Sequence, residues 1–335
     1  MTASLGRRRF VALCAGMLTL ALLAMSAAPA RADQAEGQLT IVCTVGMVGD
    51  IVQAVAGDRA RVSSLMGEGV DPHLYKPTRT DIGRLMAADV VFYNGLLLEG
   101  KMSDALIRAA SAGRKVYPVT ELLDEQYLLE PEEFAGHFDP HVWMDPVAWR
   151  SAVELVRDKL SAADPQGAAQ YRENAARYLE SVDLLDKYCR ESLARVPKDQ
   201  RVLVTAHDAF NYFGRRYGFE VVGIQGISTE SEAGVRDIER IVDLLVTRKI
   251  GAVFVESTVS DRNVRALIAG AAARGHTVAI GGELYSDAMG APDTYEGTYL
   301  GMIDHNATTI ARALGGPDAA PAAGMQGKLA SGKER

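Results

Sequence analysis

The sequence is poor in the residues that mark several protein classes. It has three cysteines and no Cys-x-x-Cys pair, so neither a disulfide framework nor a cysteine metal site is expected. Cys43 and Cys189 are predicted to be buried single thiols. There is no His-Glu-x-x-His motif and no nucleophile elbow, which are common signatures of metalloproteases and α/β-hydrolases. A net charge of −7 gives no indication of nucleic-acid binding.

Histidine is also scarce, yet two of the six histidines stand in the same tripeptide, Asp71-Pro72-His73 and Asp139-Pro140-His141. Proline fixes its own φ and favours an extended conformation in the residue before it. Each tripeptide is therefore a stiff loop that holds an imidazole in one direction. One such tripeptide is more often an ordinary turn with a polar tip. Two of them, in a chain with few histidines, favour ligands.

The N-terminus, residues 1–32, has the pattern of a signal peptide. Arg7-Arg8-Arg9 is basic, Phe10–Met25 is apolar, and Ala30-Arg31-Ala32 is a small-x-small cleavage site. We expect export to the periplasm through the Sec route or, given the arginines, the twin-arginine route. The alternative is a retained anchor, but the apolar run is short for a membrane span. Cys14 follows a large residue and is not a convincing lipidation site.

Short apolar strands alternate with helical segments along the rest of the chain, which implies βαβ units and parallel strands. The fold class is therefore predicted to be α/β, with two lobes that each contain a four-stranded, mainly parallel sheet flanked by helices. A glycine-rich loop is expected from Gly281, and Thr229-x-x-Glu232 is a candidate capping box for the helix near 232–245. The expected strands are Leu39–Val45, Arg61–Leu65, Asp89–Tyr93, Lys115–Val119, Arg201–Thr205, Phe219–Ile224, Gly251–Glu256 and Thr277–Ile280.

One long helix is expected between the lobes. The stretch from Gln166 to Arg195 has no proline, and its apolar residues recur at helical spacing. A helix of about 30 residues would be roughly 45 Å long, enough to run along two lobes. Two helices with an unmarked break are the alternative. The predicted organisation is a signal peptide (1–32), an N-terminal lobe (33–163), a linking helix (164–196), a C-terminal lobe (197–314) and a flexible tail (315–335).

Four side chains with metal chemistry fall where open α/β sheets bind ligands, beyond the carboxyl ends of strands. His73 and His141 belong to the first lobe, His207 follows the strand at 201–205, and Asp287 follows the last strand. Three imidazoles and a carboxylate suit a divalent transition metal. The alternative is that each is a helix cap or a loop anchor, which single polar residues at strand ends more often are.

Five segments strengthen the assignment because they occur in the order seen in one family. Together they resemble the metal-binding substrate-binding proteins of ABC importers, the group of TroA, ZnuA and PsaA. The resemblance implies two lobes bridged by a rigid helix, with the metal bound in the cleft by His73, His141, His207 and Asp287. At the position of His207, manganese- and iron-binding relatives often carry Glu. The segments are Gly69–His73, Gly136–Trp143, Thr205–Phe210, Gly226–Glu230 and Glu283–Asp287.

Other polar residues near these segments are weaker candidates. His137 is expected to line the entrance rather than to bind the metal. Glu230 and Glu256 are expected either to orient imidazoles from behind or to cap helices. His276 and His305 are expected to be structural.

The predicted function is capture of Zn²⁺ or Mn²⁺ by a periplasmic monomer that delivers the ion to an ABC permease in the inner membrane. It would perform no catalysis. A zinc-dependent hydrolase is the alternative, but a catalytic zinc usually keeps an open position that Asp287 would close. A metal-binding surface adhesin is a third possibility, against which the missing lipid anchor argues. The identity of the metal stays open. Three imidazoles favour zinc. Many zinc-capturing members of the family that the chain resembles carry a His-rich loop before the second ligand, whereas the segment Asp124–Gly136 is acidic and has no histidine, which favours manganese or mixed use.

Cleavage after Ala32 predicts that the mature protein begins at Asp33. We expect the processed protein in the soluble periplasmic fraction, because the apolar segment is removed with the signal. Mass spectrometry of the N-terminal peptide checks this prediction. An intact N-terminus recovered from the membrane fraction would contradict it.

Overall fold

The computed structural model describes residues 38–120, 123–316 and 325. The predicted signal peptide lies outside the described residues, as does nearly all of the predicted tail. Within the described part, no helix is both long enough and apolar enough to cross a membrane. The two described cysteines, Cys43 and Cys189, are buried and free, as predicted.

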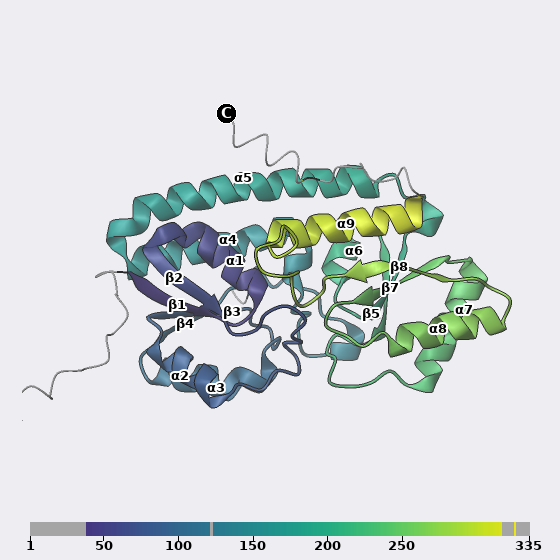
Figure 1. Ribbon diagram of the computed structural model, residues 1–335, viewed down its shortest axis with the longest axis horizontal. Helices are drawn as coiled ribbons and strands as arrows, with labels where there is room; N and C mark the ends of the chain where they lie inside the picture. Colours follow the sequence, from purple (N-terminus) through teal and green to yellow (C-terminus); the bar gives the residue numbers. More distant parts are fainter. Residues whose placement is uncertain (1–37, 121–122, 317–324, 326–335) are drawn as a thin grey trace, which may run out of the picture. The chain divides into compact units, whose positions relative to one another are not determined.

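The first lobe contains one parallel sheet with the strand order β2-β1-β3-β4. Helix α1 covers one face of the sheet and is backed by α4, while α2 and α3 lie on the other face (Figure 1). Parallel strands end at a common edge, and the loop that carries His73 leaves from this edge after β2. The elements are β1 (Leu39–Cys43), α1 (Gly46–Ala56), β2 (Ala60–Ser64), α2 (Arg79–Ala87), β3 (Val90–Tyr93), α3 (Ser103–Ser111), β4 (Lys115–Pro118) and α4 (Pro146–Ala163).

The second lobe also has four parallel strands, and the predicted α/β class is confirmed. One detail differs, because the strands form two pairs, β5 with β6 and β7 with β8, rather than one four-stranded sheet. Strands β5 and β7 are neighbours. At the end of β5, however, the His207 N–H donates its hydrogen bond to the Glu256 side chain at 2.9 Å. In a continuous sheet this N–H would donate to a backbone carbonyl of the next strand. The elements are β5 (Val202–His207), α6 (Asn211–Tyr217), β6 (Glu220–Gln225), α7 (Val235–Arg248), β7 (Ala252–Glu256), α8 (Arg262–Ala273) and β8 (Ala279–Leu284).

Strand β8 includes Gly281 and Gly282, which the sequence placed in a loop. A Cβ on Gly281 would lie 2.7 Å from the Phe254 ring and 2.9 Å from the Ala313 Cβ. Gly282 has a φ of +146°, which side chains rarely adopt, beside a bulge in the pairing with β7. The glycines therefore mark a close approach of the strand to its neighbours, not a loop.

The long helix α5 (Ala168–Leu193) is continuous over 26 residues, so the alternative of two helices is wrong. It packs against α1 and α4 of the first lobe and against α9 (Tyr299–Gly315), which in turn covers β8 (Figure 1). The larger hydrophobic core runs without a break from the first sheet through these helices to Phe254 and Leu284. A smaller core fills the space between β5, β7, α7 and α8. The shared core restricts how far the lobes can separate.

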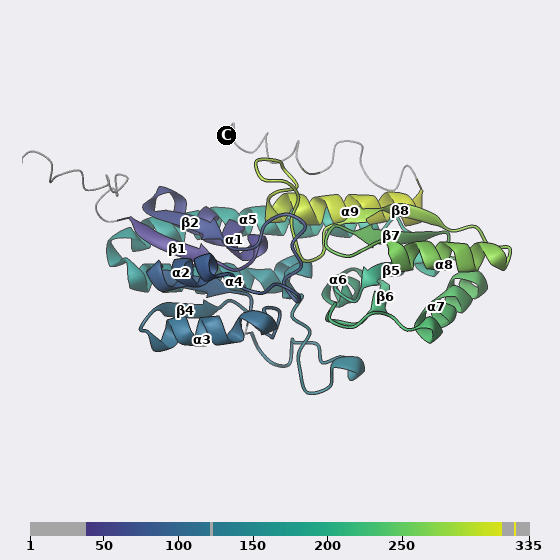
Figure 2. The same cartoon turned by 60° about the horizontal axis from the view of Figure 1, so that its bottom comes forward.

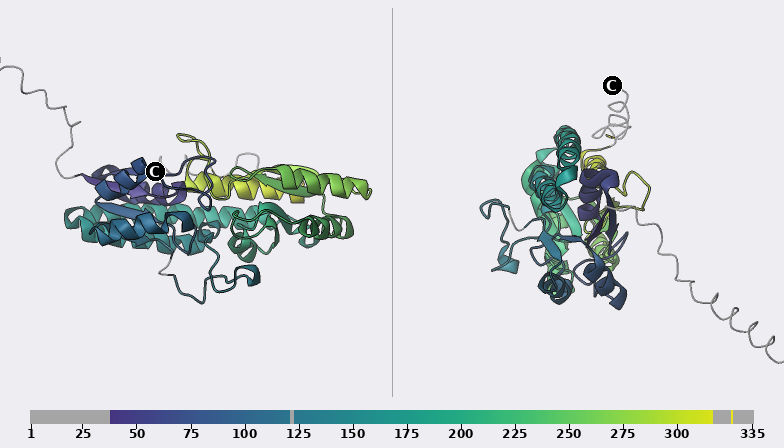
Figure 3. Two further views of the ribbon diagram at one scale, coloured as in Figure 1. Left: turned by 90° about the horizontal axis from the view of Figure 1, so that it is seen from below. Right: turned by 90° about the vertical axis from the view of Figure 1, so that its left-hand side faces the viewer.

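The acidic segment after β4 stands out from the packed layers (Figures 2 and 3). It is tied down near its start, where the Tyr127 hydroxyl donates to Asp145 and the Arg215 guanidinium lies 4.1 Å from the Tyr127 ring centroid. Asp145 also accepts from the Val147 N–H at 2.9 Å and so caps α4. The Asp145-Pro146 pair, which follows His141 and Trp143 in the sequence, therefore forms the start of helix α4.

Asp186 on α5 joins this helix to α6 through a bidentate pair with Arg216, at 2.9 and 2.7 Å. We expect Asp186→Ala to lower the free energy of unfolding by about 2–3 kcal/mol, because a largely buried, charged hydrogen-bond pair is lost. The control is Asp183→Ala, which removes an exposed pair with Arg150 on the same helix and should cost less than about 1 kcal/mol. Urea unfolding of the metal-free proteins measures both, and equal losses would contradict the prediction.

Candidate metal centre

Four residues from four separate segments meet between the lobes. His73 lies in the loop after β2, His141 precedes α4, His207 ends β5 and Asp287 follows β8. One ligand atom from each lies within 4.8 Å of the other three. None of these residues is more than 4 % exposed. The structure thus brings together all four residues that the sequence singled out as ligands.

The spacing of the inward-facing atoms suits one small metal ion. The His73 and His141 Nε2 atoms are 3.4 Å apart, and the His207 Nε2 lies 3.2 Å from Asp287 Oδ2. Asp287 is also 3.4 Å from the His141 Nε2 and 3.6 Å from the His73 Nε2. Ligands about 2.1 Å from a tetrahedral ion would stand roughly 3.4 Å apart. The His207 Nε2 and both Asp287 oxygens are buried without a hydrogen bond of acceptable geometry in the described structure, which is expected of groups that face an ion.

Two of the imidazoles are held from behind by carboxylates. The His141 Nδ1 lies 2.7 Å from Asp139 Oδ1, and the His207 Nδ1 lies 2.5 Å from Glu256 Oε2. A carboxylate there keeps the proton on Nδ1 and turns the Nε2 lone pair toward the centre. The sequence left two roles open for Glu256, orienting an imidazole or capping a helix, and its contact with the His207 Nδ1 fits the first. Asp139 was missed in this role, although its place two residues before His141 is a local signal.

His73 is held differently. Its backbone N–H donates to Asp71 Oδ1 at 2.8 Å, and the His141 N–H donates to Asp139 in the same way at 2.9 Å. The two Asp-Pro-His tripeptides therefore form the same turn. Within the described residues, however, no carboxylate lies behind the His73 ring as Asp139 lies behind His141.

Trp143 is a second residue whose role the sequence did not reveal. Its indole N–H donates to the Ser286 carbonyl at 2.9 Å, directly before Asp287. The Tyr299 hydroxyl donates to the Trp143 carbonyl at 2.9 Å. The tryptophan thus ties the segment of the second-lobe ligand to that of the first-lobe ligand His141.

The remaining candidates lie outside this cluster. His137 is exposed, and its ring centroid is 5.3 Å from that of Phe134. Glu230 lies 3.4 Å from the Lys101 ammonium rather than behind an imidazole. His276 donates to the Ile250 carbonyl and His305 to the Glu283 carbonyl, which are structural contacts.

The charges of the cluster are strongly coupled. Burial lowers the pKa of His73 to about 3, although Asp287 opposes this shift. Burial also acts against protonation of His141, but the Asp139 carboxylate and then Asp287 raise its pKa to about 9. Glu256 and Asp287 overcome burial in the same way and raise the pKa of His207 well above its usual range. The two imidazoles hold the pKa of Asp287 well below its usual range against the effect of burial.

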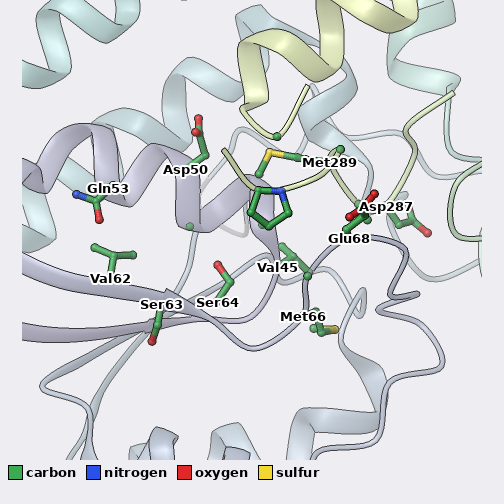
Figure 4. A pocket seen from close by; sticks show the side chains of 17 residues that line it. Val45, Asp50, Gln53, Val62, Ser63, Ser64, Met66, Glu68, Asp287 and Met289 are labelled. Carbon is green, nitrogen blue, oxygen red and sulfur yellow. The ribbon is translucent and has the colours of Figure 1, made fainter. Parts of the chain in front are cut away.

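A cavity of about 330 Å³ adjoins the centre on one side (Figure 4). It lies between α1, β2 and the segment after β8, and Asp287 forms part of its wall. The other polar groups that line it include Asp50, Gln53, Ser64 and Glu68.

Comparisons with known proteins find related sequences and a similar fold. Residues 41–313 match the family described as the periplasmic component A of zinc-uptake complexes, ZnuA. The chain is 48 % identical over 280 residues to the manganese-binding lipoprotein MntA of Bacillus subtilis, covering 84 % of this chain and 91 % of that one. It is 43 % identical over 302 residues to the zinc-binding protein TroA of Treponema pallidum, covering 90 % and 96 %. The solved structure of the periplasmic zinc-binding protein TroA from Treponema pallidum superposes with a TM-score of 0.81 at 44 % identity, covering 83 % of this chain and 99 % of that one.

We expect metal binding at pH 7 to release about two protons per ion, because the raised pKa values of His141 and His207 favour a proton on each Nε2 that the metal must displace. The apparent affinity should therefore rise with pH until both His141 and His207 have titrated. Calorimetry in two buffers of different ionisation enthalpy measures the release. Asp139→Asn should release about one proton fewer, because it removes the carboxylate that raises the pKa of His141. Binding without proton release in the unmodified protein would contradict the assignment.

Proposed function

The chain belongs to the family of the periplasmic component A of zinc-uptake complexes, and from this membership we propose that His73, His141, His207 and Asp287 capture its metal ion. The protein is a metal-binding substrate-binding protein of an ABC importer. The observation that supports the residue assignment is the convergence of one buried ligand atom from each of the four residues. Among the described residues, the His207 Nε2 and both Asp287 oxygens have no hydrogen bond to satisfy them.

Capture rather than catalysis is supported by the coordination that the side chains offer. A catalytic zinc keeps a position for water among three protein ligands. Here Asp287 supplies a fourth ligand, and all four residues are almost fully buried. The family is one of transport receptors, not of enzymes. A site that encloses its ion fits cargo that must be held and later surrendered.

The cargo is Zn²⁺ or Mn²⁺, and the ligand set accommodates both. Zinc favours four nitrogen and oxygen ligands, which the four residues provide. The two oxygens of Asp287 face different imidazoles, Oδ1 toward His141 and Oδ2 toward His207. The carboxylate is therefore oriented to offer both oxygens to Mn²⁺, the larger of the two ions. The relatives are named for each metal, manganese for MntA and zinc for TroA.

Proteins of this family work with the membrane components of an ABC transporter. We propose that this chain acts as a monomer in the periplasm, reached through the signal segment 1–32, and delivers its ion to a permease in the inner membrane. The shared core along α5 and α9 supports a small relative motion of the lobes during delivery, since a wide opening would expose apolar surface.

Metal should stabilise the folded protein, because the site exists only in that state. At a free metal concentration roughly a thousandfold above Kd, the gain is about 4 kcal/mol, which corresponds to a rise in Tm of roughly 5–10 °C. We expect this rise with Zn²⁺ or Mn²⁺ and not with Mg²⁺ or Ca²⁺, which prefer all-oxygen ligands. Differential scanning calorimetry of chelator-stripped protein at pH 7.5 measures it.

Matched variants test the residue assignment in the same experiment. His141→Ala and Asp287→Ala should each lose most of the metal-induced rise in Tm. His137→Ala, four residues before His141 but exposed, should keep it. No rise in the unmodified protein, or an equal rise with Mg²⁺, would contradict the proposed function. An equal loss in His137→Ala would contradict the choice of ligands.

A further inference from the structure

The segment Gly226–Gly234, between β6 and α7, reaches from the second lobe to the first. Its Thr229 is 8 % exposed, and the Thr229 hydroxyl donates to Asp71 Oδ2 at 2.6 Å. The capping box predicted for Thr229 is wrong, because α7 begins only at Val235. There the Gly234 N–H donates to the Asp237 carboxylate at 3.1 Å, which leaves the threonine hydroxyl available to Asp71.

Asp71 connects this threonine to a ligand. Its Oδ1 accepts the backbone N–H of His73 at 2.8 Å, while its Oδ2 accepts the hydroxyl of Thr229. One carboxylate therefore joins the second lobe to the turn that carries His73. When the segment around Thr229 moves, Asp71 loses one of its two partners and the turn is less firmly held.

His73 is the ligand most sensitive to such a change. The His141 and His207 rings are each fixed by a carboxylate behind Nδ1, whereas the described structure holds His73 through its backbone turn. His73 is also the most exposed of the four ligands, at 4 %, and the next residue, Leu74, is 44 % exposed. His73 is thus the most exposed of the four residues and, among the described residues, the one imidazole of the three without a carboxylate behind its ring.

We propose that Thr229 is a positioning residue for His73 and that its hydrogen bond to Asp71 sets the rate at which bound metal is released. The inference rests on the function proposed above. Loss of this bond frees His73 while His141, His207 and Asp287 stay in place, so the ion leaves from a three-ligand state. The lobes then need only a local movement of the 226–234 segment, which agrees with the continuous core behind them.

A neighbouring contact supplies a control. Glu230, directly after Thr229, pairs with Lys101 of the first lobe at 3.4 Å, with side chains that are 52 % and 29 % exposed. An exposed pair of this kind contributes little, because solvent and salt screen it. Glu230→Gln therefore alters the same segment and the same crossing between lobes without touching Asp71.

The experiment measures release of Zn²⁺ from the loaded full-length mature protein into an excess of a chromogenic chelator by stopped flow. Thr229→Val keeps the size of the side chain and removes the hydroxyl, and we expect release about tenfold faster, since a hydrogen bond to a charged group is lost. Thr229→Ala should behave alike, and Thr229→Ser should restore the slow rate. Glu230→Gln should stay within about twofold of the unmodified protein.

The double variant separates positioning from general loosening. In an Asp71→Ala background, Thr229→Val should add no further acceleration, because the two residues act through one bond. The melting curve of each metal-free variant confirms that it is folded. Release from both Thr229→Val and Thr229→Ala at the unmodified rate, or equal acceleration by Glu230→Gln, would overturn the inference. Unmodified protein that binds no Zn²⁺ would instead overturn the proposed function itself.

Discussion

The metal centre depends on two hydrogen bonds that fix where the histidine protons lie. Asp139 and Glu256 lie behind the Nδ1 atoms of His141 and His207, so that the Nε2 atoms of both rings face the centre. The same carboxylates favour a second proton on each ring in the metal-free protein. On the proposed ligand assignment, a divalent ion that displaced these two protons would leave the net charge of the buried site unchanged.

This chemistry needs an interface between the two lobes that is rigid enough to keep the four side chains in place. Helices α5 and α9 provide the rigidity, because one hydrophobic core runs along them from the first sheet to β7 and β8. Trp143 reinforces this interface close to the ion through its bond to the Ser286 carbonyl. The support through Thr229 and Asp71, by contrast, is a single hydrogen bond between the lobes. Firm support from the shared core and light support beside His73 suit a receptor that must release what it binds.

Sequence patterns located most elements, since alternation of strands and helices is a local property. They failed where packing overrides local preference. Gly281 and Gly282 suggested a loop, but they lie in β8 because Phe254 and α9 leave no room for a side chain. Glu230 and Glu256 were equal candidates for orienting an imidazole. Only the fold separates them, placing Glu256 behind His207 and Glu230 beside Lys101.

The sequence alone determined the α/β class, the long helix and the small set of residues with metal chemistry, because periodicity, Asp-Pro-His turns and histidine scarcity can be recognised within short segments. The tertiary structure decided which atoms meet. His207 and Glu256 are 49 positions apart, and Thr229 and Asp71 are 158 apart, and no local pattern encodes either pair. Such contacts arise only when β5 is set beside β7 and one lobe against the other, since hydrogen bonds between distant residues depend on the packing of the whole core.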